Sequence, residues 1–177
     1  MKTAIIIGST GLTGGILLQK LLKDRRYGKI KLFSRSSCKI TDPKIEEHLL
    51  DLFELEKYKE LFTADEVFCC IGTTQKRTPD KTTYHKIDYG IPVSAAKLAK
   101  ENGISTFLVI SALGANPESR FFYNKTKGEM ERDVLKQKIP QTYIFQPSLI
   151  SGDRKEKRPF EFVWKKMMKI GDYLLLG

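Results

Sequence analysis

The chain has 177 residues, of which 41% are hydrophobic and 29% are charged, and its formal net charge is +10. This length and composition are typical of one globular α/β domain and exclude a disordered chain. No apolar run reaches the roughly 18 residues that a bilayer span requires, so we expect no membrane-spanning segment. Basic residues are mixed with acidic ones, which indicates a solvated surface with attraction for an anionic ligand and argues against nucleic-acid binding.

The apolar run after Lys2 ends at Gly8 and is too short for the core of a secretory signal peptide. Three cysteines, two of them adjacent, show neither a disulfide framework nor metal-ligand spacing. We therefore expect buried thiols, no metal site and a cytoplasmic location.

Short apolar runs alternate with longer amphipathic segments, a pattern that predicts a parallel sheet with helices on both faces. The expected strands are residues 3–7, 29–33, 48–50, 66–71, 106–110 and 141–145. The expected helices are residues 12–23, 84–102 and 120–138, of which the second ends at Asn102-Gly103 and the third is closed by Pro140. This order predicts a doubly wound α/β fold of the Rossmann type, with strand order 3-2-1-4-5-6.

A glycine-rich turn follows the first expected strand directly. Gly8, Gly11 and Gly14 form the pattern G-x-x-G-x-x-G, at which a helix begins. The first glycine allows a sharp turn, the second lets backbone N–H groups approach a pyrophosphate, and the third lets the helix lie close to the sheet. The helix N-terminus adds oriented N–H donors and a partial positive charge. The predicted dinucleotide-binding turn comprises Gly8, Thr10, Gly11, Leu12, Thr13 and Gly14.

The end of the second expected strand indicates which dinucleotide is bound. NAD sites carry an acidic residue there, about 20 residues after the glycines, to bind the ribose 2′-hydroxyl. Here Arg35 stands 21 residues after Gly14, next to Ser34, and no carboxylate is present at this strand end. A guanidinium pairs with a 2′-phosphate and a serine hydroxyl can hydrogen-bond it, so the segment predicts NADP(H) as the cofactor. The alternative is a plain surface arginine.

A serine, a tyrosine and a lysine form the second motif. Ser111 follows the strand expected at residues 106–110, and Tyr123 and Lys127 lie four residues apart, so that on a helix they share one face. Tyr-x-x-x-Lys alone is a frequent chance pattern. A strand-terminal serine 12 residues before the tyrosine, downstream of a glycine turn, makes it more specific.

These segments together resemble the atypical branch of the short-chain dehydrogenase/reductase superfamily, and most closely its Tat-interacting-protein-like oxidoreductases. The resemblance covers residues 3–160 and is carried by residues 8–14, 34–35, 51–52, 71–74, 111–115, 122–129 and 146–148. It implies that Ser111 hydrogen-bonds a substrate carbonyl, that Tyr123 donates or accepts the proton, and that Lys127 holds the nicotinamide ribose and favours the phenolate. Many members carry an asparagine in the helix before the serine strand. Here Asp88 and Tyr89 are the nearest candidates, which leaves the proton relay open.

The resemblance also places other residues around the cofactor. Asp51 and Leu52, at the end of the third expected strand, are expected beside the adenine. Ile71, Gly72 and Thr73, at the end of the fourth, are expected over the adenine-side ribose and the pyrophosphate. Pro147 is expected to line the nicotinamide pocket.

Residues 1–150 are therefore predicted to form one NAD(P)-binding Rossmann domain, followed by a C-terminal extension at residues 151–177. The extension contains a helix candidate at residues 160–170 and ends in an apolar run that needs a surface to pack against. We expect it to be part of a truncated substrate-binding or packing region.

The sequence thus predicts an NADPH-dependent oxidoreductase that reduces a carbonyl, or oxidises an alcohol, of a small-molecule substrate. A second interpretation is an NADPH-binding regulatory or scaffold protein with little or no turnover. A sugar-nucleotide epimerase or dehydratase would need a larger substrate domain than the roughly 30 residues after Pro147 supply. Homo-oligomerisation is left open.

Overall fold

The computed structural model describes residues 1–148, of which Met1–Pro147 form one compact unit. Its six strands are all parallel and form a single sheet in the order β3-β2-β1-β4-β5-β6. The order reverses between β1 and β4, which confirms the predicted doubly wound fold with strand order 3-2-1-4-5-6. In chain order the strands are β1 (Lys2–Ile7), β2 (Tyr27–Ser34), β3 (Ile45–Leu49), β4 (Glu66–Cys69), β5 (Thr106–Ile110) and β6 (Gln141–Phe145).

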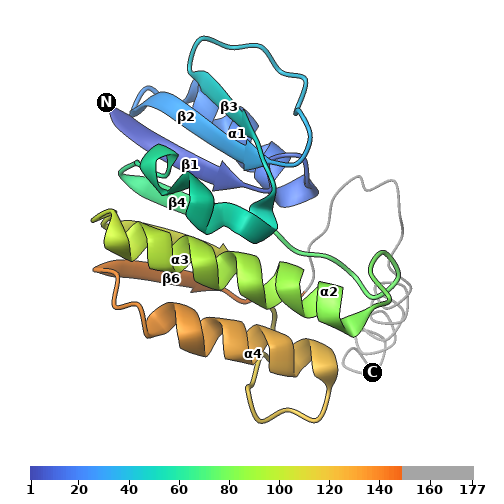
Figure 1. Ribbon diagram of the computed structural model, residues 1–177. Helices are drawn as coiled ribbons and strands as arrows, with labels where there is room; N and C mark the ends of the chain where they lie inside the picture. Colours follow the sequence, from blue (N-terminus) through green and yellow to red (C-terminus); the bar gives the residue numbers. More distant parts are fainter. Residues whose placement is uncertain (149–177) are drawn as a thin grey trace, which may run out of the picture. The chain divides into compact units, whose positions relative to one another are not determined.

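Helices cover both faces of the sheet, as the apolar strands require. Figure 1 shows α3 (Ile91–Glu101) and α4 (Phe122–Leu135) side by side on one face, with α1 (Leu12–Lys23) behind β1 and β2. Side chains of β1 alternate between the two layers: Ile5 and Ile7 belong to the larger core cluster, which includes residues of α3 and α4, and Ile6 packs with Leu18 of α1. This layering leaves the carboxyl ends of all six strands at one end of the sheet.

Two connections differ from the expected pattern. The third strand was expected at residues 48–50 and is instead Ile45–Leu49, because an edge strand with only partly buried side chains lacks the continuous apolar run of a central strand. A 3-10 helical stretch, η1 (Leu52–Leu61), follows it and was not expected; it buries Leu52 and Leu55 but is otherwise largely polar.

The helix expected at residues 84–102 is interrupted. It consists of α2 (Lys81–His85), a π-helical turn η2 (Lys86–Gly90) and α3. Pro92 near the start of α3 has no N–H group, so the ordinary bond to the carbonyl of Asp88 cannot form. The N–H of Ile91 bonds the carbonyl of Lys86, one residue before the carbonyl of Ile87 that an α-helix would use. The helix is therefore wider around Asp88.

The extension at residues 151–177, with its helix candidate, lies outside the described residues and stays a prediction. Among residues 1–148, no helix combines the length and the apolar composition needed to cross a bilayer.

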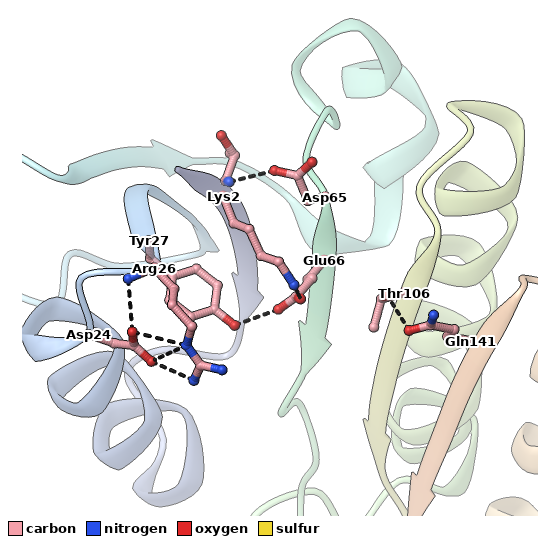
Figure 2. Close-up of polar contacts among 9 residues, drawn as sticks. Lys2, Asp24, Arg26, Tyr27, Asp65, Glu66, Thr106 and Gln141 are labelled. Carbon is pink, nitrogen blue, oxygen red and sulfur yellow. Dashed lines mark hydrogen bonds and ion pairs between the residues drawn. The ribbon is translucent and has the colours of Figure 1, made fainter.

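Polar contacts join the strands at the amino-terminal end of the sheet, opposite the glycine turn. Glu66, the first residue of β4, is buried and accepts hydrogen bonds from the Tyr27 hydroxyl and the Lys2 ammonium group, as Figure 2 shows. Asp65 accepts a bond from the N–H of Thr3 at 2.7 Å. Burial and the Glu66 hydrogen bond raise the pKa of Tyr27, so the phenol stays protonated and serves as a donor.

Replacement of Tyr27 by Phe tests this contact. It leaves the buried Glu66 carboxylate without one donor and is expected to lower the free energy of unfolding by about 1–3 kcal/mol in chemical denaturation. The control is Tyr143→Phe, because Tyr143 is 49% exposed and its hydroxyl has no hydrogen-bond partner within residues 1–148. The control should change stability by less than about 0.5 kcal/mol. Equal effects of the two changes would contradict a stabilising role for the contact.

Candidate functional site

The glycine turn connects the carboxyl end of β1 to α1 and is tightly packed. Gly8 has a φ of +86°, a left-handed conformation that favours glycine, and an added Cβ there would lie 3.1 Å from the Cys70 backbone. An added Cβ at Gly14 would lie 2.2 Å from the Gly8 carbonyl oxygen, so α1 begins in direct contact with the turn. No side chain caps α1 at Gly11, which leaves the N–H groups of its first turn available to a ligand.

Ser9 lies inside this turn and was not among the residues predicted from the sequence. Its side chain is buried, and its Oγ has no hydrogen-bond partner among the described residues. Buried hydroxyl groups are normally paired, because an unpaired one costs about 1–3 kcal/mol. An unpaired hydroxyl beside uncapped N–H groups fits a phosphate oxygen, so the residues of the turn fit the diphosphate of a dinucleotide.

A hollow of about 440 Å³ opens beside the end of β2, where the sequence predicts recognition of the 2′-phosphate of NADP(H). It is lined by Arg35, Leu49, Leu50, Asp51 and Phe53. Leu49 and Phe53 are about half exposed and offer apolar walls of the kind that suits a base. Arg35 is exposed and forms no ion pair with another residue of the described chain. The hollow therefore brings together Arg35 and Asp51, two of the residues predicted at the adenosine end.

Two other residues of that predicted set have different surroundings. Ser34 is buried, and its hydroxyl donates to the carbonyl of Ser36 at 2.8 Å, which shapes the turn that carries Arg35. Leu52 is buried in the core. Only its neighbour Asp51 reaches the hollow, and the Asp51 carboxylate accepts a bond from the N–H of Phe53 at 2.9 Å at the start of η1.

A buried ion pair lies at the ends of β4 and β5. The Nζ of Lys127, on α4, is 2.9 Å from Oδ1 of Asp88, and the two side chains are 5% and 1% exposed. The other Asp88 oxygen accepts the N–H of Thr73 at 2.8 Å, and Lys127 donates to the carbonyl of Ile110 at 3.3 Å. An added Cβ at Gly72 would lie 3.4 Å from Asp88 Oδ1. The pair thus joins the π-helical turn and α4 to two strand ends.

The three residues predicted after β4 have different surroundings: one packs against the core, and two lie beside this ion pair. Ile71 packs against the larger core cluster, whereas Gly72 is exposed and Thr73 is bonded to Asp88. The backbone N–H of Thr73 is therefore committed to the protein rather than to a ligand.

Ser111 is buried directly after β5, and its hydroxyl donates to the carboxylate of Glu131 on α4. Gln146, after β6, donates to the two Glu131 oxygens at 2.9 and 3.0 Å. The carbonyl of Pro147 accepts a backbone bond of 3.2 Å from the loop after Ser111, so Pro147 is held beside it. Glu131 was not predicted from the sequence. Its position four residues after Lys127, on the same helix face, is the signal that could have identified it.

Tyr123 lies near the start of α4, one turn before Lys127 on the same face. It is 37% exposed, and its hydroxyl has no hydrogen-bond partner in the part of the chain that the structure describes. Ser111 and Lys127 are thus tied to the protein, while the phenol is accessible to a ligand.

Two adjacent free cysteines, Cys69 and Cys70, lie at the end of β4. Burial raises the pKa of the Cys69 and Cys70 thiols to about 12, so both stay protonated at neutral pH. No group of three or more His, Cys, Asp or Glu residues suited to a metal ion occurs within residues 1–148. The polar side chains that the described site brings together carry hydroxyl, ammonium, guanidinium and carboxylate groups.

Comparison with known proteins also indicates a nicotinamide cofactor. Residues 8–158 match the model of a family described as NAD(P)H-binding. The mitochondrial protein FMP52-1 of Scheffersomyces stipitis is 34% identical over 161 residues, which covers 88% of this chain and 70% of the relative. The HTATIP2 protein of Rattus norvegicus is 30% identical, over 93% of this chain and 69% of the relative.

Solved structures agree on the fold. The Bordetella bronchiseptica enzyme WbmG in complex with NAD matches with a TM-score of 0.75 at 12% identity. The match covers 95% of this chain, and the chain spans 60% of the length of WbmG. At this identity the likeness shows a shared Rossmann-type fold.

The cytoplasmic location predicted from the sequence is contradicted by the relatives. FMP52 proteins of Scheffersomyces stipitis, Meyerozyma guilliermondii and Candida albicans are named as mitochondrial and point to mitochondria instead. The prediction was wrong because the lack of a secretory signal core does not distinguish between compartments inside the cell.

Replacement of Ser9 by Ala tests whether the turn is built for a ligand. It removes an unpaired buried hydroxyl, so the unliganded protein is expected to gain about 1 kcal/mol of unfolding free energy in chemical denaturation. Titration with NADPH, followed by fluorescence, should show a Kd raised by about fivefold, because a phosphate contact is lost. Ser105→Ala, at an exposed position before β5, is the control and should leave both quantities unchanged. Loss of stability in Ser9→Ala would show that the hydroxyl has a partner within the protein.

Proposed function

The chain belongs to the NAD(P)H-binding family of the atypical short-chain dehydrogenase/reductase superfamily, near the HTATIP2-like proteins, and from this premise we propose that it is an NADPH-dependent oxidoreductase. Its substrate would be a small molecule whose carbonyl is reduced or whose alcohol is oxidised. The observation that carries the proposal is the buried group of Ser111, Lys127 and Asp88, at the same end of the sheet as a glycine turn with an unpaired hydroxyl.

The cofactor would lie across the strand ends from β2 to β5. The first turn of α1 and Ser9 would hold the diphosphate, and the hollow beside Leu49 and Phe53 would hold the adenine. Arg35, exposed at this hollow and without an ion-pair partner in the described chain, would pair with a 2′-phosphate. A bound nicotinamide supplies or accepts a hydride at the substrate carbon.

Side chains of α4 and of Ser111, directly after β5, would transfer the proton and position the groups that react. Tyr123, accessible and unpaired within the described residues, would donate a proton to the substrate oxygen or accept one from it. Ser111 would orient that oxygen, and Lys127, held by Asp88, would bind the nicotinamide ribose. Because the Ser111 hydroxyl donates to Glu131, it must rotate before it can donate to a carbonyl.

A regulatory or scaffold protein that binds NADPH with little turnover is the second candidate. The observation that favours it is that the two residues expected to act with Tyr123 are bonded elsewhere in the protein: Ser111 to Glu131, and Lys127 to Asp88. A cofactor-loaded protein with these contacts unchanged would hold NADPH without completing the reactive arrangement.

Arg35→Ala tests the cofactor assignment. Loss of a guanidinium–phosphate pair is expected to raise the Kd for NADPH by about 10- to 100-fold in isothermal titration, and to leave the Kd for NADH within about twofold. Arg25→Ala removes the same charge from an exposed position away from the hollow and controls for net charge. An equal loss of affinity for both cofactors would contradict recognition of the 2′-phosphate.

Tyr123→Phe distinguishes the enzyme from the regulatory protein. Loss of NADPH absorbance with a panel of aldehydes and ketones should be slower by about 100-fold or more in kcat/KM, because the proton donor is absent. The Kd for NADPH should not change, and Tyr143→Phe should resemble the wild type in both measurements. Turnover that survives the change would remove the assigned role of Tyr123. Tight NADPH binding without turnover in the wild type would favour the regulatory protein.

A further inference from the structure

The charges of Asp88 and Lys127 balance each other within a closed set of contacts. In the described chain, Lys127 Nζ contacts the Asp88 carboxylate and the Ile110 carbonyl, and the second Asp88 oxygen contacts the Thr73 N–H. No other acidic or basic side chain of residues 1–148 is within ion-pair distance of either group. The pair therefore contributes one positive and one negative charge, and its net charge is zero.

Both charged groups of the pair are buried, so the balance of their charges matters for the electrostatic potential nearby. With side chains 5% and 1% exposed, neither group is screened by water as a surface pair would be. Removal of either partner would leave an uncompensated charge in a poorly solvated place. The electrostatic potential at this end of the sheet thus depends on both residues.

The two redox forms of a nicotinamide cofactor differ in the charge of the reacting ring. The oxidised ring carries one positive charge, and the reduced ring is neutral. A lone ammonium group beside the ring would disfavour the oxidised form, and a lone carboxylate would favour it. A neutral pair discriminates little between them.

We propose that Asp88 keeps the site from discriminating strongly between the two redox forms of the cofactor. By cancelling the charge of Lys127, it removes the repulsion that would otherwise weaken binding of the oxidised, cationic nicotinamide relative to the reduced, neutral one. The inference rests on the proposed function, because it requires a nicotinamide cofactor bound with its ribose at Lys127.

The Asp88 carboxylate is held in a defined position. Asp88 lies in the π-helical turn just before Pro92, and such turns are rare and frequently occur at functional sites. Its two oxygens contact different elements, Lys127 of α4 and the Thr73 N–H after β4. A role limited to holding these elements together would affect both redox forms equally, and the two roles are therefore separable.

The test is the Kd of each redox form for Asp88→Asn. Asparagine keeps the size of the side chain and an oxygen acceptor, but it removes the counter-charge. The ratio of Kd for NADP⁺ to Kd for NADPH is expected to rise by about tenfold over the wild type at low ionic strength, the effect of one partly screened charge. The same ratio for NAD⁺ and NADH should move in the same direction.

Two further variants keep the test decisive if Asp88→Asn fails to fold. Lys127→Met leaves the carboxylate alone and should lower the ratio below the wild-type value. The double variant Asp88→Asn, Lys127→Met removes both charges, is the more tolerable change for a buried pair, and should return the ratio to the wild-type value. Asp133→Asn is the matched control, because Asp133 is likewise an ion-paired carboxylate but lies on α4 and is bonded to Arg132, Lys136 and Tyr89. It should leave the ratio unchanged.

The outcomes separate the inference from the proposed function. Wild-type protein that binds none of the four nicotinamide nucleotides contradicts both. Wild-type protein that binds them, with ratios that stay within twofold in Asp88→Asn and Lys127→Met, overturns the inference alone. An equal loss of affinity for both redox forms would show that Asp88 only holds the structure together, and it also overturns the inference.

Discussion

The buried pair of Lys127 and Asp88 is the interaction on which the arrangement of the site depends. It joins a turn before α3, the middle of α4 and the ends of two neighbouring strands. The residues that it brings together reach from Thr73 to Lys127, which are 54 residues apart in the chain. A buried pair of this kind adds little net stability, but the loss of one partner is expensive. The pair therefore acts mainly as a constraint: any arrangement of α4 against the sheet must keep the two charges in contact.

The opposite half of the site follows a different physical logic. Around the glycine turn, backbone groups dominate: Gly14 lies against the Gly8 carbonyl, and the N–H groups of α1 are uncapped. An anion there is attracted by dipoles that the fold fixes in advance, so no side chain has to be ordered on binding. At Lys127 and Ser111, by contrast, every polar group is held by another side chain or carbonyl. One half of the site is thus open to a ligand, whereas in the other half Lys127 and Ser111 make their contacts within the protein.

Prediction from the sequence succeeded where the signal was local and apolar. Strands β5 and β6 and helix α1 have the expected bounds, and the glycine spacing identified the turn after β1. It failed where the structure depends on partners. Strand β3 is an edge strand stabilised by pairing with β2, and the π-helical turn arises because Pro92 removes one donor. The sequence also does not show that the Ser34 hydroxyl bonds the carbonyl of Ser36 in its own turn, because that contact depends on the fold.

Helix α4 explains why the reactive residues can be recognised from spacing although their contacts cannot. Lys127 and Glu131 project from successive turns of one face, and each bonds to the end of a different pair of strands: Lys127 to Ile110 and, through Asp88, to Thr73, and Glu131 to Ser111 and Gln146. Tyr123 occupies the preceding turn of the same face. Because the helix is rigid over this length, the contacts of Lys127 and Glu131 also fix the height and rotation at which the phenol is presented. The four-residue spacing therefore reflects a helix that is held against the sheet at two points, and the accessible tyrosine takes its position from the two residues that make these contacts.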